Sequence, residues 1–156
     1  MATINEIQDS IIEEFGDFED WLDRYQLLID LGNEQEPLPE EYKTDNNLIE
    51  GCQSRVWLQA DFVDGKVLFR AESDALIVKG IVSLLIQVYS GHTPDEILES
   101  EPYFVDQWQM LPYYSTSAII FIYSKTSTTS PSFFKNRSKN FGFWQHVLGV
   151  SSTSVF

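Results

Sequence analysis

One residue of this chain has the chemistry of a strong nucleophile at neutral pH: Cys52, the only cysteine among 156 residues. Its neighbours are a glycine and several polar or charged residues, namely Glu50, Gly51, Gln53, Ser54 and Arg55. Free cysteines usually pack as small apolar residues, but these neighbours are not typical of a core. Gly51 also permits backbone conformations that turn a side chain outward. The local sequence therefore favours a functional thiol.

The reactivity of such a thiol depends on its charge state, because the thiolate is the nucleophile. Arg55 would favour the thiolate, whereas Glu50 would oppose it. Thiol exchange is most effective when the pKa of the attacking thiol is close to the ambient pH. We therefore expect a mildly tuned thiol in Cys52, with the five neighbouring residues as the supporting loop.

Three other functions compete with this interpretation. A cysteine hydrolase needs a histidine base beside the thiol, and an iron–sulfur scaffold needs several converging ligands. His92 and His146 are the only histidines, and nothing in the sequence places either near Cys52. The third alternative is a binding module in which Cys52 has no chemical role. We expect no resident metal and no cofactor.

Composition restricts the class of protein. A chain of 156 residues is long enough for one domain with its own core. The net charge is −14, and all 24 acidic residues lie within residues 1–106. An acidic body repels phosphate backbones, so we expect no nucleic-acid partner. A single cysteine cannot form an intrachain disulfide, and no apolar run is long enough to cross a bilayer. With no signal-peptide pattern in Met1–Glu14, we expect a cytoplasmic protein that does not bind membranes.

The N-terminal third predicts two helices. Thr3 and Glu6 form a capping-box pattern ahead of a stripe of spaced isoleucines that ends at Gly16. Asp17 is a candidate cap for the second helix, and Gly32 is expected beyond its end. The apolar and aromatic residues of both helices are expected to face the core.

The middle of the chain predicts a sheet and a central helix. Two alternating segments joined by Asp64-Gly65 predict a β-hairpin over 56–71. We expect 47–49 to pair with it as a third strand, which would place Cys52 in a tight loop at the sheet edge. Ser73 or Asp74 is expected to cap a largely buried helix over 75–89.

A short helix is expected after Thr93, because Pro94 suits the first helical position and Glu96 completes a capping box. The order of helix, helix, hairpin, helix and helix separates the sheet from the helices. This order predicts an α+β fold with a small antiparallel sheet.

With these elements in place, residues 1–106 resemble the SufE family of sulfur-acceptor proteins. The motifs that carry the resemblance are, in chain order, Trp21 and Tyr25, Leu28-Ile29-Asp30-Leu31-Gly32, Leu38-Pro39, Gly51-Cys52-Gln53-Ser54-Arg55-Val56-Trp57, Asp74-Ala75-Leu76-Ile77-Val78-Lys79-Gly80, and Thr93-Pro94-Asp95-Glu96-Ile97. The resemblance implies the SufE/IscU-like fold. It also implies that Cys52 accepts persulfide sulfur from a SufS-like cysteine desulfurase and stimulates it, for iron–sulfur cluster assembly.

The same resemblance implies a sulfur-transfer partner of the desulfurase and not a stand-alone enzyme. An iron–sulfur scaffold as a further partner and a homodimer are both left open. In the free protein the family would keep the cysteine under apolar residues, with Gly51 as the pivot that lets it extend.

The C-terminal third departs from the family pattern. From Gln107 onward there is no acidic residue, and the aromatic residues follow no sustained period. The Ser-Pro-x-Arg-x-x-Gly-like run that the family carries is missing. We therefore predict a SufE-like domain over 1–106 and a divergent tail over 107–156, either disordered or read from another frame.

Overall fold

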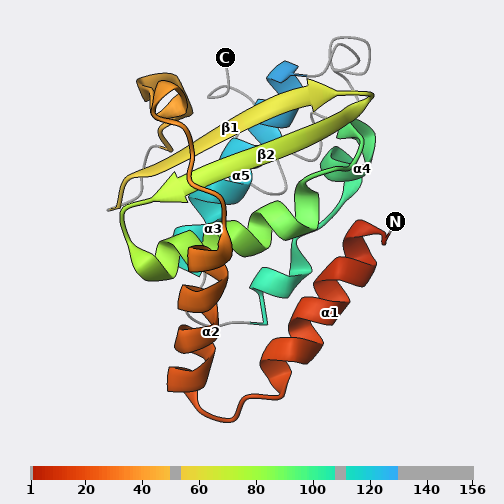
Figure 1. The fold of residues 1–156 in the computed structure, drawn as a ribbon. Coiled ribbons are helices and arrows are strands. Elements are labelled where there is room, and N and C mark those ends of the chain that lie inside the picture. Colours follow the sequence, from red (N-terminus) through yellow and green to blue (C-terminus); the bar gives the residue numbers. More distant parts are fainter. Residues whose placement is uncertain (1, 50–53, 108–111, 130–156) are drawn as a thin grey trace.

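The computed structural model describes residues 2–49, 54–107 and 112–129. In these residues the chain forms an α+β fold, as predicted (Figure 1). The main elements are α1 (Ile4–Gly16), α2 (Trp21–Glu34), β1 (Val56–Val63), β2 (Lys66–Ser73), α3 (Leu76–Tyr89), α4 (Pro94–Glu99) and α5 (Pro112–Thr129). Short 3-10 helices occur at η1 (Glu40–Tyr42), η2 (Asp45–Asn47) and η3 (Tyr103–Val105).

The predicted capping boxes are both confirmed. The Thr3 hydroxyl accepts a hydrogen bond from the Glu6 amide, and the Glu6 carboxylate accepts one from the Thr3 amide at 2.8 Å. Thr93 and Glu96 repeat this arrangement at the start of α4. In each case the motif satisfies amides that have no partner within the helix.

The predicted hairpin is also confirmed. Asp64 and Gly65 both have positive φ, 51° and 80°, which matches the right-handed twist of the two strands they join. The register pairs Val56 with Ser73 at one end and Val63 with Lys66 at the turn. The turn thus fixes which side chains of β1 and β2 face the helices.

The expected third strand is wrong in its extent. Its main-chain contacts with β1 in the described residues are an isolated bridge between Leu48 and Trp57 and a hydrogen bond from the Ile49 amide to the Val56 carbonyl. Asn47 belongs to the 3-10 helix η2. The Asn47 amide donates to the Thr44 carbonyl, which turns the backbone before Leu48. The sheet therefore has two strands in the described part of the chain.

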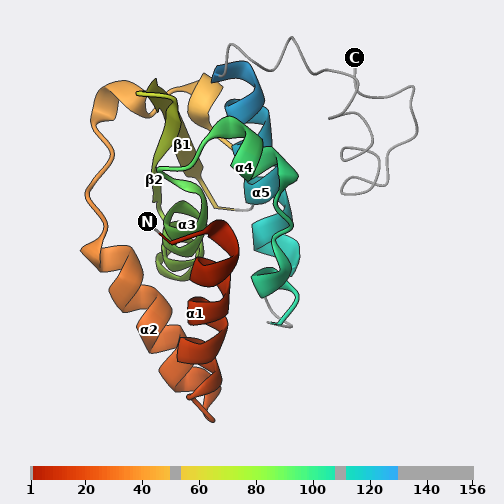
Figure 2. The same ribbon diagram turned by 90° about the vertical axis from the view of Figure 1, so that its right-hand side faces the viewer.

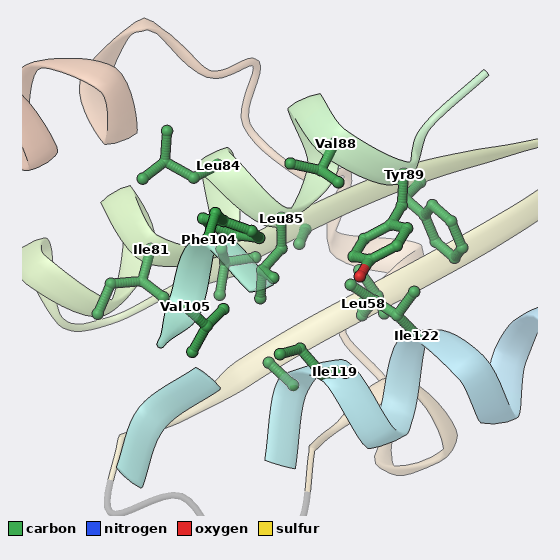
Figure 3. Packing of buried hydrophobic residues seen from close by; sticks show 14 of the residues in the cluster. Leu58, Ile81, Leu84, Leu85, Val88, Tyr89, Phe104, Val105, Ile119 and Ile122 are labelled. Atoms are coloured by element: carbon green, nitrogen blue, oxygen red, sulfur yellow. The ribbon is translucent and has the colours of Figure 1, made fainter. Parts of the chain in front are cut away.

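Helix α3 lies at the centre of the molecule, as predicted. It packs against β2 on one side and against α2 on another, whereas α5 packs against β1 (Figures 1 and 2). Figure 3 shows side chains of α3 meeting those of β1, η3 and α5 in one core, including Leu85, Leu58, Phe104 and Ile122.

Two details of α2 differ from the expectation. The cap is Asp20 and not Asp17, because the Asp20 carboxylate accepts from the Leu22 amide. Gly32 lies inside α2 and not beyond it, and a Cβ there would lie 2.9 Å from the Gly80 nitrogen of α3. Gly32 is therefore required for the close approach of two helices.

Within the predicted tail, residues 112–129 form α5, although the aromatic residues there follow no sustained period. This helix contributes core residues, among them Ala118, Ile119, Ile122 and Tyr123, each at most 5% exposed. The rest of the predicted tail, 130–156, lies outside the described residues. The domain boundary at residue 106 stays a prediction.

Candidate functional site

The structure describes the two ends of the segment that carries Cys52. Glu50, Gly51, Cys52 and Gln53 themselves lie outside the described residues. On the N-terminal side the described chain ends at Ile49, which is buried, and it resumes at Ser54. The geometry of the site is therefore the geometry of these two ends and of the elements that hold them.

Main-chain hydrogen bonds bring the two ends together. The Ile49 amide donates to the Val56 carbonyl at 2.8 Å, and Leu48 forms a bridge with Trp57. Ile49 and Val56 are both almost completely buried. The two described ends that flank Cys52 therefore meet at the end of the hairpin opposite the turn (Figure 1).

Asp74 holds the C-terminal end of the segment. The Arg55 amide donates to Asp74 Oδ1 at 3.0 Å, and the Asp74 amide donates to the Arg55 carbonyl at 3.2 Å. The expectation that Ser73 or Asp74 caps α3 is wrong, because the cap position is Ala75, which has no side-chain cap bond. The Asp74 carboxylate instead accepts from the amide of Arg55, the residue directly before β1. The Arg55 side chain is exposed, and its effect on the thiol stays a prediction.

Charged and aromatic side chains cover the outer face of the hairpin next to this point. Lys43 Nζ lies 2.7 Å from a Glu40 oxygen and 3.0 Å from Glu72 Oε2, and 5.9 Å from the centre of the Trp57 ring. Hydrogen bonds to the carboxylates of Glu40 and, to a smaller extent, of Glu72 raise the pKa of Lys43. These contacts attach the segment around η1 to the strands on either side of the site.

Asn47 is a residue that the sequence interpretation missed. Its amide nitrogen donates to the Tyr42 carbonyl and to Gln59 Oε1, both at 2.8 Å, and its amide oxygen accepts from Lys125 Nζ at 2.8 Å. The residue is 6% exposed, so these bonds form away from bulk water. No sequence signal marks an asparagine for this role, because its partners come from three separate segments and Lys125 is 78 residues away.

An open groove of about 350 Å³ runs between this region and α5. Leu48 and Ile49 form one side of the groove, and Ile120, Phe121 and Ser124 of α5 form the other. Asp45 and Asn46 complete its lining. The N-terminal end of the Cys52 segment therefore borders a concave surface and not a flat one.

The described histidine is far from the site. His92 is 4% exposed and pairs with Val67 near the hairpin turn, and its Nδ1 lies 3.6 Å from Glu96 Oε2. Val67 and Ser73 are separated by six residues of strand, or about 20 Å. His92 is thus too distant to act as a base for a thiol that lies just before β1. This position disfavours a hydrolase that uses His92.

Metal ligands do not gather in the described part of the chain. No group of three or more His, Cys, Asp and Glu side chains in 2–49, 54–107 and 112–129 could hold a metal ion. Over the same ranges, no helix combines the length and the apolar character needed to span a bilayer.

Comparisons with known proteins agree with the motifs. Residues 9–118 match the model of the SufE family, described as an Fe-S metabolism associated domain. An uncharacterised SufE-like protein of Synechocystis sp. is 43% identical over 105 residues, which are 67% of this chain and 66% of that protein. The chain thus matches just under two thirds of the length of this relative.

A solved structure supports the fold. The solution structure of a hypothetical protein from Thermus thermophilus superposes with a TM-score of 0.64 at 20% identity. The superposition covers 79% of this chain and 95% of that one. At this identity the similarity establishes the architecture alone.

Proposed function

This chain belongs to the SufE family, and from that premise we propose that Cys52 accepts sulfane sulfur from a cysteine desulfurase. The family domain is associated with Fe–S metabolism. The observation that carries the proposal is the placement of the single cysteine. It lies in the matched region, in a segment whose two ends are fixed to each other by main-chain hydrogen bonds.

The transfer is a thiol exchange that needs no external oxidant or reductant. The Cys52 thiolate attacks the outer sulfur of a persulfide on the desulfurase, and a new S–S bond forms on Cys52. The S–S bond of the donor breaks, and its cysteine leaves as a thiolate. The outer sulfur keeps its proton and now forms the persulfide of Cys52. The number of thiols, thiolates and persulfides is the same before and after the step.

Charge and geometry support a protein partner for this step. A donor persulfide is reached only if the acceptor thiol leaves its own fold and enters the pocket of the donor. A segment with two anchored ends can do this while the rest of the protein stays folded. The acidic body, with a net charge of −14 for the chain, suits a desulfurase with a basic rim, because complementary potentials raise the association rate.

The direct test is mass spectrometry of the purified chain after incubation with a SufS-like cysteine desulfurase and free cysteine. We expect one added sulfur on Cys52 and a faster release of alanine by the desulfurase. The Cys52→Ser variant should lose both effects and still bind the desulfurase. If Cys52→Ser stimulates the enzyme as well as the wild type does, the chain is a binding module and not an acceptor.

A matched control uses the neighbouring serine. The double variant Cys52→Ser with Ser54→Cys keeps one thiol but moves it two residues along the segment. We expect no recovery of stimulation, because the thiol must reach the donor persulfide in line with its S–S bond. Full recovery would mean that any thiol in the segment is sufficient.

A further inference from the structure

Asn47 joins three segments immediately before the Cys52 segment. Its amide nitrogen bonds to Tyr42 of η1 and to Gln59 of β1, and its amide oxygen bonds to Lys125 of α5. Only Leu48 and Ile49 separate Asn47 from the first residue of the Cys52 segment. The position of Asn47 therefore determines where that segment begins.

The contact with Lys125 is the connection between this point and the C-terminal helix. Lys125 is partly buried, which lowers its pKa, and its ammonium lies 5.3 Å from the centre of the Phe121 ring. None of the ion pairs in the described residues uses this ammonium. Its described polar partner is the neutral amide of Asn47 at 2.8 Å. Hydrogen bonds from charged donors are shorter and stronger than neutral ones.

We propose that Lys125 is a positioning residue for sulfur transfer: by holding Asn47 it fixes the position of Ile49, at which the described chain ends before Cys52. The inference rests on the proposed function of Cys52 and adds a role for α5, in the part of the chain that departs from the family pattern. Lys125 acts through Asn47 and is not a catalytic residue.

The physical argument concerns populations. Without the ammonium, the buried amide oxygen of Asn47 loses its donor. The bonds from Asn47 to Tyr42 and Gln59 and the main-chain contacts of Leu48 and Ile49 with β1 remain, and they hold the N-terminal end less tightly. The end of the segment then occupies several positions. A partner that binds one of them sees an affinity reduced by the fraction of molecules in that position. The rate of sulfur transfer within the complex of the two proteins does not change.

The first test measures the local structure without any desulfurase. In the Lys125→Met variant, which keeps the apolar stem over Phe121, we expect the Ile49 amide to exchange with solvent at least about fivefold faster. Amides in α1 should exchange as in the wild type. Lys125→Arg should restore slow exchange, because its guanidinium can donate to the same oxygen. Thr128→Ala, an exposed position on the same helix, is the matched control.

The second test measures transfer kinetics at several concentrations of the acceptor. Lys125→Met should raise the apparent KM for the acceptor by about fivefold and leave kcat within a factor of two. A variant that simply unfolds would lower the active fraction and the thermal unfolding midpoint, and Lys125→Gln offers a milder replacement in that case. Equal Ile49 exchange and equal KM in wild type and Lys125→Met would overturn the inference.

The two proposals fail differently. If Cys52 takes up no sulfur in the wild type, the proposed function is wrong, whatever Lys125 does. If Cys52 takes up sulfur but Lys125→Met behaves as the wild type in both tests, only the positioning role is wrong.

Discussion

Helices α4 and α5 are opposite cases within one fold. Helix α4 has six residues, and its start is marked in the sequence by Thr93, Pro94 and Glu96. Helix α5 has eighteen residues and begins with Pro112 but has no capping-box pattern, yet it supplies several of the most buried side chains. A short helix can thus be specified by its cap, whereas a long one can be specified by the surface on which it packs.

The buried face of α5 explains why its pattern was missed. Ala118, Ile119, Ile122 and Tyr123 follow a helical spacing, but the next positions on that face are Thr126 and Ser127. Both hydroxyls donate to the carbonyl four residues earlier, at 2.8 Å, so neither needs water. A pattern that counts Thr and Ser as exposed therefore misses a face that is buried.

The strongest test of this contrast removes a core side chain of α5. Ile122→Ala should lower the free energy of unfolding by about 2–5 kcal/mol, because Ile122 is 1% exposed and its loss leaves a cavity. Ile120→Ala is the matched control on the same helix. Ile120 borders the groove and is half-buried, so we expect a loss of roughly 1 kcal/mol. Chemical denaturation measures both, and equal losses would contradict the packing of α5 on the core.

The second test addresses the part of the fold that the sequence motifs describe well. Gly80→Ala should destabilise the protein by about 3 kcal/mol, because the new Cβ would overlap the Leu28 carbonyl and force α2 away from α3. Gly16→Ala is the control, since nothing lies within 4 Å of a Cβ at that position. A stable Gly80→Ala variant would show that the two helices separate more easily than their packing indicates.

The third test concerns the buried hydrogen bonds that link α3, α5 and the C-terminal end of α4. Tyr89 and Tyr123 place their hydroxyls 3.2 Å apart, and Tyr123 donates to the Ser100 carbonyl at 2.9 Å. Tyr123→Phe should cost about 1–2 kcal/mol, because two buried groups lose a partner. Tyr103→Phe, which removes more accessible bonds to Asn5 and Asp9, should cost less. Denaturation curves that show the reverse order would argue against a connected core.

The smallest effect is expected at the cap of α4. Thr93→Ala should cost about 1 kcal/mol. Backbone and side-chain hydrogen bonds from Thr93 lower the pKa of Glu96 below its ordinary value of 4.5, although burial partly opposes this. The Glu96 carboxylate therefore contributes its full stabilisation above that pH, and this part of the cap is lost as the pH falls through the lowered pKa. The bond from the Glu96 amide to the Thr93 hydroxyl does not titrate and remains.

Unfolding measured at pH 7 and pH 3 checks the sign of this dependence. The difference in stability between wild type and Thr93→Ala should shrink at the lower pH. A difference that grows on acidification would contradict the assignment of the cap.

Much of the fold could be predicted because its signals are local. Capping boxes, the Asp64-Gly65 turn and the apolar faces of α1 and α3 each depend on residues close in sequence. The errors have a common cause in long-range contacts. Gly32 was assigned to a helix end because its partner, Gly80, is distant in the chain, and Asp74 was assigned to a cap because its bond to Arg55 crosses the hairpin.

The candidate site also divides into features with local sequence signals and features that depend on long-range contacts. Cys52 and its neighbours are a prediction from residue types alone, and the family match covers their positions. Asn47 could not be found in this way, since its partners Tyr42, Gln59 and Lys125 meet only in the folded chain. Residue chemistry can propose a nucleophile, whereas the residues that would position it can be found only in the tertiary structure.

The closure between Ile49 and Val56 has a consequence for protein engineering. Because this junction is made by backbone atoms, it does not depend on the side chains of the residues it encloses. The six enclosed residues, 50–55, can therefore be exchanged, for example for a sequence with selenocysteine at position 52, without redesign of the rest of the fold. The fold thus supports an exchangeable sequence between two ends that are joined through the backbone.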